Sequence, residues 1–204
     1  MKKKKKDKIK KQEFDLKKEY KQCWNFIKES KYFIWSIVII FFAFVFVGYF
    51  IPAPDYLSES IMKFLEDLIN QTKGMSVGQL ISFIFFNNLQ SSFIGMILGV
   101  FFGFFSILFA LFNGYVLGFV SAIAVKAENG LVLLQLLPHG IFELPAIFLS
   151  LGLGIKLGSF VFKKDKLNSF KEYFSNCIKI FLLVIVPLLI LASIIEGTLM
   201  FFVG

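Results

Sequence analysis

The sequence predicts an all-α membrane protein, a polytopic transmembrane helix bundle of about five spans. Three observations predict it: 57 % of the 204 residues are hydrophobic, 29 are phenylalanine, and the charge is placed unevenly. The first 31 residues hold 13 lysines and five acids, whereas the rest of the chain holds nine of each, so the net charge of +8 precedes the first apolar run. Soluble domains carry about a quarter charged residues, whereas 18 % of the residues are charged here. This distribution excludes a disulfide scaffold, a disordered chain and a globule that binds nucleic acid through a basic face.

Residues 1–31 form a basic leader that we expect in the cytoplasm. Its second half places Leu16, Tyr20, Trp24 and Ile27 near one helical face, which is typical of an amphipathic helix lying on lipid headgroups. Each lysine near an anionic leaflet contributes about 1 kcal/mol of attraction. We therefore expect membrane lipids, and no nucleic acid, as a partner of the leader. A solvated tail remains the alternative for its first residues.

The remaining residues, 32–204, are predicted to form a single transmembrane bundle. Twenty helical residues span about 30 Å, the thickness of the hydrocarbon core. Residues 79–125 contain no charge and would extend about 70 Å as one helix, so they require two spans with a turn, which we place near 101–105. The predicted spans are 32–52, 79–100, 105–125, 131–162 and 177–199.

The fourth predicted span contains helix-breaking residues. Residues 131–162 would make about 48 Å of helix, which is again too long for one straight crossing. Pro138 and Gly140 favour a break near 138–140. Two arrangements stay open for the irregular segment at 131–145: a re-entrant half-helix before a full span, or one kinked helix over the whole stretch.

The placement of lysines predicts the orientation of the spans. The leader and the link 163–176 are basic and are expected in the cytoplasm, whereas the loop 53–78 holds four acids against two lysines and is expected outside. Apolar residues recur at helical spacing from Leu57 to Leu68, which predicts an amphipathic helix resting on the outer membrane surface or on the bundle. Five spans satisfy all three placements, with the N-terminus cytoplasmic and the C-terminus outside the cell membrane.

Small residues recur at every fourth position in three consecutive spans. Apolar side chains gain nothing by leaving lipid, so close backbone approach through small residues drives the association of membrane helices. The rows therefore predict a tight bundle whose helices cross through glycine. The glycines of these rows are Gly95, Gly99, Gly103, Gly114, Gly118, Gly154 and Gly158.

A set of polar residues lies within the apolar spans. We interpret Glu143 as the only acid buried well within an apolar run, and His139 precedes it by four residues, on the same face if the chain is helical there. A carboxylate at mid-bilayer costs at least about 2.5 kcal/mol, so it must face protein or water. Asn87, Asn88 and Asn113 supply amides near the same depth. Three interpretations stay open: a wet site that relays a proton or holds a cation, a lock between helices or subunits, and a structural pair that satisfies backbone groups freed by prolines.

An enzymatic site of the kind found in soluble hydrolases has no support in the sequence. His139 is the single histidine, which excludes a multi-histidine metal centre, and the two cysteines lie far apart. No serine sits in a nucleophile motif, and patterns that cradle phosphate are absent from the sequence. We therefore expect no catalytic residue, no metal and no cofactor, with an intramembrane enzyme acting on lipid as a minor alternative.

The string from Leu137 to Ala146, Leu-Pro-His-Gly-Ile-Phe-Glu-Leu-Pro-Ala, resembles the signature of the stage II sporulation protein M family of integral membrane proteins. Asn87-Asn88 and Asn113-Gly114 resemble that family's pattern as well. The resemblance covers most of the chain and implies a multi-pass protein of about five spans. In spore formers, members help to assemble a membrane complex whose other subunits degrade peptidoglycan, and the M component is not the enzyme. The sporulation role is not carried over to this chain. The positions that match the family's polar motif are Asn87, Asn88, Asn113, His139 and Glu143.

Two hypotheses for function follow. The first is a non-enzymatic scaffold or subunit of a membrane complex, which forms a homo-oligomer or binds membrane partner proteins, with the basic leader placed to dock a cytoplasmic partner. The second is a small transporter or channel subunit that uses Glu143 and His139 as an intramembrane proton or cation site.

Overall fold

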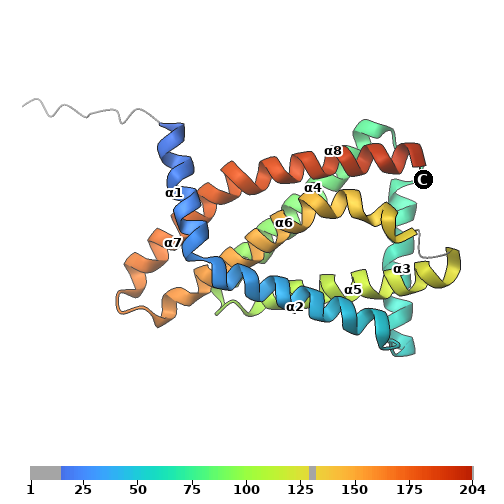
Figure 1. Ribbon diagram of the computed structural model, residues 1–204, viewed down its shortest axis with the longest axis horizontal. Coiled ribbons are helices and arrows are strands. Elements are labelled where there is room, and N and C mark those ends of the chain that lie inside the picture. Colours follow the sequence, from blue (N-terminus) through green and yellow to red (C-terminus); the bar gives the residue numbers. More distant parts are fainter. Residues whose placement is uncertain (1–14, 129–131, 204) are drawn as a thin grey trace, which may run out of the picture.

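The computed structural model describes the backbone of residues 15–128 and 132–203, and the side chains of residues 15–126 and 143–202. Regular structure in this part of the chain is entirely helical, and the long helices run along one axis (Figure 1). Five helical stretches are long and apolar enough to cross a membrane, which confirms the predicted all-α bundle. They are Lys31–Phe50, Val77–Val100, Phe104–Lys126, Glu143–Phe162 and Lys166–Phe202.

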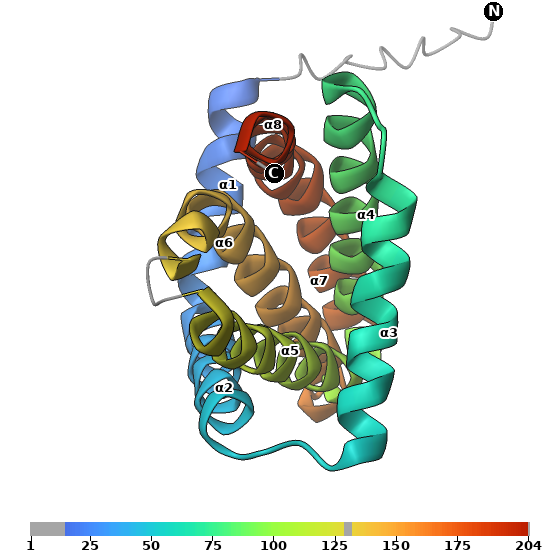
Figure 2. The ribbon, with the colours of Figure 1, turned by 90° about the vertical axis from the view of Figure 1, so that its right-hand side faces the viewer.

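The segments that connect the spans gather at the two ends of the bundle. At one end, here the α1 end, α1 (Leu16–Glu29) lies near the start of α7 (Lys166–Ile180) and the turn between the second and third spans (Figure 1). At the other, the α3 end, α3 (Asp55–Thr72) crosses the bundle where α8 (Val186–Val203) finishes (Figure 2). The described part of the basic leader and the basic link therefore share one end, and the acidic loop occupies the other, as five spans require.

α1 is docked on the protein along one of its faces. The Asp15 carboxylate caps the helix by accepting from the backbone N–H of Lys17 at 3.0 Å. Cys23 and Phe26 are buried, and the Phe26 ring meets Tyr173 of α7 edge to face at 5.8 Å. Of the four apolar residues predicted to lie on lipid, Leu16, Tyr20 and Trp24 are largely exposed, whereas Ile27 is half-buried and packs against the bundle. α1 thus buries one apolar face against the bundle and exposes another.

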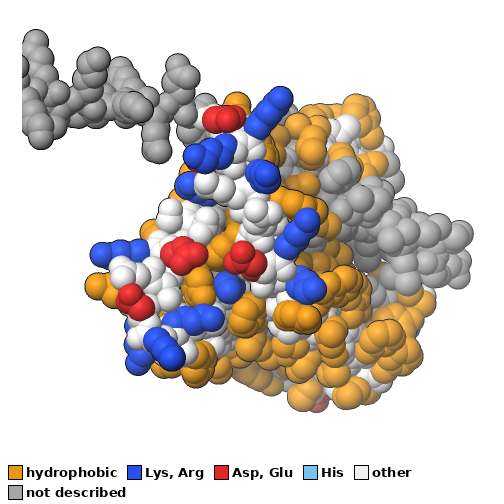
Figure 3. All heavy atoms as spheres, turned by 60° about the vertical axis from the view of Figure 1, so that its left-hand side comes forward, with side chains coloured by type: hydrophobic (Ala, Val, Ile, Leu, Met, Phe, Trp, Pro, Cys, Tyr) orange, Lys and Arg blue, Asp and Glu red, His pale blue; other side chains and the backbone are white. Residues whose placement is uncertain are grey.

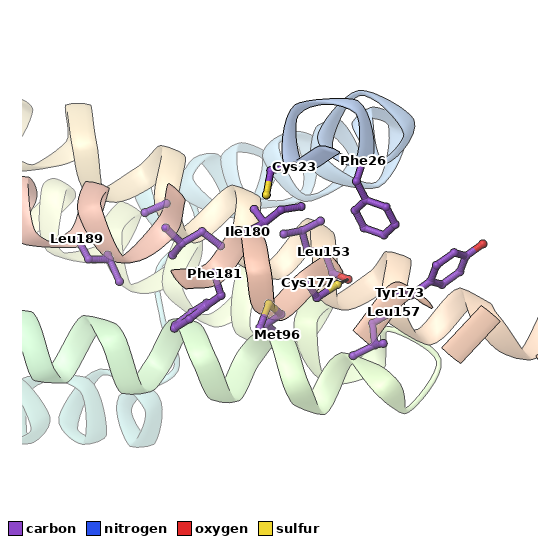
Figure 4. Close-up of a cluster of buried hydrophobic side chains, with 12 residues drawn as sticks. Cys23, Phe26, Met96, Leu153, Leu157, Tyr173, Cys177, Ile180, Phe181 and Leu189 are labelled. Carbon is purple, nitrogen blue, oxygen red and sulfur yellow. Dashed lines mark hydrogen bonds between the residues drawn. The ribbon is translucent and has the colours of Figure 1, made fainter. Parts of the chain in front are cut away.

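A cluster of buried apolar side chains lies behind α1 (Figure 4). It joins α1 and α7 to α4 (Val77–Ile97), to α6 (Val132–Gly158) and to α8. Figure 4 shows residues from these helices pointing toward one another, with Met96, Leu153 and Cys177 at 0 % exposure. Burial of this kind holds the α1 end together.

α2 (Lys31–Phe50) and α5 (Phe104–Glu128) cross backbone against backbone. A Cβ added at Gly114 would collide with the carbonyl of Phe41, and one added at Gly48 would collide with the carbonyl of Tyr115. Gly118 meets the backbone of α2 in the same way. Close approach of this kind is possible only where side chains are absent. Gly48 provides the glycine of α2 in this contact. It does not belong to a row of small residues at every fourth position, so the sequence pattern did not predict it.

α4 and α6 cross through the other two rows of small residues. A Cβ at Gly99 would collide with the backbone of Gly154, and one at Gly158 would collide with Gly99 and Gly103. Gly95 lies against the side chain of Leu151. The fourth-position spacing on both helices therefore produces one extended glycine contact.

The turn between the second and third spans lies at residues 98–103, next to its predicted position. A short 3₁₀ segment, η1 (Leu98–Val100), ends the second span. Phe102 and Gly103 then adopt positive φ angles of 57° and 76°. Glycine takes this left-handed conformation without a steric penalty, so Gly103 lets the chain reverse within a few residues.

The break predicted near residues 138–140 does not occur. α6 runs as one helix from Val132 to Gly158, followed by the 3₁₀ segment η2 (Ser159–Phe162). The ribbon bends within its N-terminal half (Figure 1), so the kinked helix, and not a re-entrant half-helix, describes 131–145 over its described part. A proline removes one backbone hydrogen bond and bends a helix, but it need not end the helix inside a bundle.

The last span belongs to a longer helical run than the predicted 177–199. The helix already begins at Lys166 and continues through the π-helical segment η3 (Phe181–Ile185) into α8. Tyr173 of the predicted link and Cys177, one turn later at the start of the predicted span, are both buried. This apolar face explains why the basic link is helical over most of its length.

A carbonyl freed by Pro187 connects α1 to the last span. Proline has no N–H with which to bond the carbonyl of Leu183, four residues earlier. The hydroxyl of Tyr20 donates to that carbonyl across 3.3 Å. Lys179 and Glu19 form a salt bridge of 2.7 Å nearby. Polar contacts therefore fix α1 on the α7–α8 run in addition to its apolar face.

α3 is the amphipathic helix predicted within the acidic loop. Leu57, Leu65 and Leu68 are half-buried and Ile61 is buried, whereas Phe64 is exposed. Figure 2 shows the helix lying across the end of the bundle. Its apolar face therefore rests on the bundle, as expected from the spacing of its leucines.

Candidate functional site

Glu143 lies on the face of α6 that packs against α4. Ser150, seven residues later, donates from its Oγ to the carbonyl of Ser92 in α4 at 2.5 Å. Gly154 lies against the carbonyls of Gly95 and Met96 in the same helix. Residues seven apart lie on one face of a helix, so Glu143 continues this face toward the α3 end.

Asn88 and Asn113 occupy the matching faces of α4 and α5. Asn88 precedes Ser92 by one helical turn. Ser106 of α5 donates to the carbonyl of Gly95 at 2.7 Å, and Asn113 follows Ser106 by seven residues. These polar residues of three spans therefore continue the faces through which α4, α5 and α6 contact one another, and we call this set the α4–α5–α6 junction.

The asparagine amides at this junction are engaged within their own helices. Asn113 donates to the carbonyl of Phe109 at 2.7 Å, and the amide nitrogen of Asn87 lies 3.5 Å from the side-chain oxygen of Asn88. Asn87 and Asn113 are exposed, and Asn88 is half-buried. Because an amide offers two donors and an acceptor, one contact leaves further hydrogen-bonding capacity at each side chain. The exposed amides can therefore bind another polar group.

Glu143 is paired with a second carboxyl group, that of Glu196 in α8. The two side chains lie close enough to share a hydrogen bond. Gly197, the next residue, packs against Ile81 of α4 and fixes the register of α8 at this level. A carboxylate has no donor, so a hydrogen bond between two carboxyl groups requires a proton on one of them. The pair can hold a shared proton, or it can hold a cation when both groups are ionised.

Glu196 is a site residue that the sequence analysis passed over. It lies within the predicted span 177–199 and satisfies the same criterion as Glu143, an acid inside an apolar run. Glu143 stood out because prolines and a histidine surround it, and no such motif surrounds Glu196. A search for every acid within a predicted span would have found both.

His139 lies outside the residues whose side chains the structure describes, so its partnership with Glu143 stays a prediction. Its backbone falls in α6, four residues before Glu143. Across residues 15–126 and 143–202, no three His, Cys, Asp or Glu side chains form a group that could hold a metal ion. The chemistry that the described side chains support here is the exchange of a proton or the binding of a monovalent cation.

Comparisons with known proteins agree with the resemblance in the motif. The family model described as "Stage II sporulation protein M" matches residues 37–199, which include parts of all five spans. An uncharacterized protein of Methanocaldococcus jannaschii is 32 % identical over 178 residues, which cover 84 % of this chain and 79 % of that protein. No solved structure matches the chain.

Proposed function

The chain belongs to the stage II sporulation protein M family, and from that premise we propose that it is a non-enzymatic subunit of a membrane assembly. It associates with a second copy of itself through the α4–α5–α6 junction. The five apolar spans make it a membrane protein, and at the junction three of those spans carry asparagine or glutamate side chains.

The observation that carries this proposal is the exposure of Asn87 and Asn113 on membrane-spanning helices. An amide in hydrocarbon without a full set of hydrogen bonds is costly. Polar side chains on membrane helices are satisfied by neighbouring helices or by water. A helix of another subunit at the junction would supply these bonds and cover the amides.

The distribution of charge supports a cytoplasmic α1 end. Figure 3 shows lysine and acid side chains gathered over one part of the surface, with apolar side chains over most of the rest of that face. Lys163, Lys164 and Lys166 lie in or beside the short link before α7, whereas α3 carries the acids of the opposite end. Lysines favour the cytoplasmic side. In this orientation the N-terminus is cytoplasmic and the C-terminus lies outside.

The proposal is tested by replacing both exposed amides with leucine. Membranes that contain the full chain are cross-linked, and the species are separated by size. The wild-type chain is expected in complexes larger than one subunit, and the variant Asn87→Leu with Asn113→Leu is expected to lose most of them because the polar contact is gone.

The matched control replaces Phe86 and Phe112, the exposed neighbours of the two asparagines, with leucine. This pair is expected to leave the complexes unchanged. Equal complexes in the amide variant and in the control would exclude the junction as the contact. A wild-type chain that is monomeric in membranes would exclude the proposal itself.

The pair of Glu143 and Glu196 favours a second candidate, a proton- or cation-coupled transporter or channel subunit. Ionisable groups inside a bundle often mark the path of an ion. Proteoliposomes that contain the full chain are tested for proton and monovalent-cation flux. Flux that is lost in both Glu143→Gln and Glu196→Gln would support transport, whereas no flux under a proton or cation gradient favours the subunit role.

A further inference from the structure

Lys156 is a buried cation within an aromatic cage at the α1 end. Its side chain belongs to α6 and is 9 % exposed. The Nζ atom lies 4.5 Å from the ring centroid of Tyr173, 5.7 Å from that of Phe26 and 5.8 Å from that of Phe33. These rings come from α7, α1 and α2, so three separate elements close around one ammonium group.

No carboxylate of the described part of the chain neutralises this charge. The salt bridge present among those residues joins Lys179 to Glu19. Aromatic rings attract a cation through their quadrupole but carry no net negative charge. A buried charge without a counter-charge is costly. The described residues therefore supply no counter-charge for Lys156.

A cavity of about 340 Å³ opens beside Lys156. Lys163 also lines the cavity and adds a second cationic side chain. Ser159 also lines it, and its hydroxyl donates to the carbonyl of Lys156 at 2.6 Å, so its proton is already engaged. The other described residues that line the cavity are apolar: Phe33, Phe102, Ile155 and Phe162. Two cations among described walls that contain no acid favour an anionic ligand.

The surroundings of the cavity are those of a lipid-facing boundary. Phe102 is 68 % exposed and Phe162 is 81 % exposed, and both lie where spanning helices end. Phe101 and Phe104 at the same turn are also more than half exposed. Large exposed rings at helix ends are typical of the interface between headgroups and acyl chains. A ligand here meets ammonium groups with one part and aromatic rings with another.

We propose that this cavity binds the phosphate headgroup of an anionic membrane phospholipid. Lys156 and Lys163 contact the phosphate, which supplies the counter-charge for the buried ammonium, and the acyl chains lie along the exposed phenylalanines. Because Phe26 belongs to α1, the occupied site also favours the docked position of α1. The site lies at the α1 end, away from the α4–α5–α6 junction, so the proposal does not depend on the proposed function.

Native mass spectrometry of the full chain in detergent tests the site, with phosphatidylglycerol, phosphatidylcholine and inorganic phosphate as probes. Phosphatidylglycerol is expected to bind at least tenfold more tightly than phosphatidylcholine, and millimolar inorganic phosphate is expected not to displace it. Lys163→Gln is expected to weaken phosphatidylglycerol binding about fivefold, since each lysine near a membrane anion contributes about 1 kcal/mol.

Lys164→Gln is the matched control, because Lys164 is exposed and adjacent but does not line the cavity. The affinity of this variant for phosphatidylglycerol is expected to stay within about twofold of wild type. Lys156→Met is expected to weaken phosphatidylglycerol binding more than Lys163→Gln does. If Lys156→Met does not fold, the affinities of Lys163→Gln and Lys164→Gln decide whether the cavity is a specific site. Equal losses in that pair would overturn the site in favour of general surface attraction. Displacement by inorganic phosphate would overturn the lipid in favour of a free anion.

Discussion

The two ends of the bundle differ, although the same helices build both. At the α1 end, α4 and α6 touch through Gly99 and Gly154 beside a buried apolar cluster. Toward the α3 end, the same two helices carry Asn88 and Glu143, which are half-buried, and α5 carries the exposed Asn113. Figure 1 shows α4 and α5 separating as they run from their turn toward α3.

The difference shows how a bundle with little polar surface can position a polar site. In lipid, helices associate where their backbones approach, so the contact of Gly99 with Gly154 fixes the crossing of α4 and α6 at the α1 end, which we call the closed end. Beyond this crossing, α4 and α5 diverge toward the start of α4, which we call the open end (Figure 1). A side chain added at the closed end is therefore expected to destabilise the protein more than one added at the start of α4.

The largest effect is expected from Gly154→Ala at the closed end. Its Cβ would collide with the Ser106 hydroxyl and would lie 3.0 Å from the carbonyl oxygen of Met96 and 3.1 Å from that of Gly95, so Ser106 must turn away from its hydrogen bond to Gly95 and α4 must shift away from α6. Overpacking of this kind costs about 1–3 kcal/mol. We expect a clear fall in the midpoint of thermal unfolding for the detergent-solubilised protein, measured by the loss of helical circular dichroism.

Gly78→Ala is the matched control from the start of α4 at the open end. No atom lies within 4 Å of the position that its Cβ would take. A helical glycine is about 0.5–1 kcal/mol less favourable than alanine, so this change is expected to be neutral or slightly stabilising. Equal stabilities for the two alanine variants would remove the distinction between the ends.

A smaller effect is expected from Ser150→Ala, which removes the hydrogen bond from α6 to the Ser92 carbonyl of α4. The loss of a buried hydrogen bond costs about 1 kcal/mol. The comparison is Ser82→Ala, because the exposed Ser82 hydroxyl donates to Gly78 of its own helix at 2.9 Å. Ser150→Ala is expected to unfold at a lower concentration of denaturing detergent than Ser82→Ala. A loss as large in Ser82→Ala would show that the bond between the helices adds no stability.

The number of spans and the position of the turn could be predicted from the sequence because the bilayer fixes helix length. The uncharged stretch 79–125 exceeds one crossing, so two helices and a turn follow from length alone. The outcome at Pro138 could not be predicted in this way. Whether a proline bends or breaks a helix depends on tertiary partners for the freed carbonyls, and the spacing of residues does not reveal them.

The site could be predicted only in part, for a related reason. Spacing placed Asn88, Asn113 and Glu143 on helix faces that the structure directs to one junction. Glu196 comes from α8, and the pairing of α8 with α6 is a tertiary contact without a local signal. Likewise, one glycine in α2, Gly48, forms no row and is recognised only through the helix that crosses it.

The smallest effect is expected for the docking of α1 on the bundle, which can be measured by the rate at which Cys23 is alkylated. Burial raises the pKa of the Cys23 thiol, so the docked state holds its proton more tightly than the undocked state. The free energy of docking α1 is therefore constant below the ordinary thiol pKa and becomes less favourable as the pH rises beyond it.

In a Cys177→Ser background, alkylation of Cys23 at pH 8 is expected to be slower than alkylation of a free cysteine. Tyr20→Phe removes the bond to the Leu183 carbonyl, worth about 1 kcal/mol, and is expected to raise the rate about fivefold. A rate equal to that of free cysteine in both proteins would mean that α1 is not docked on the bundle.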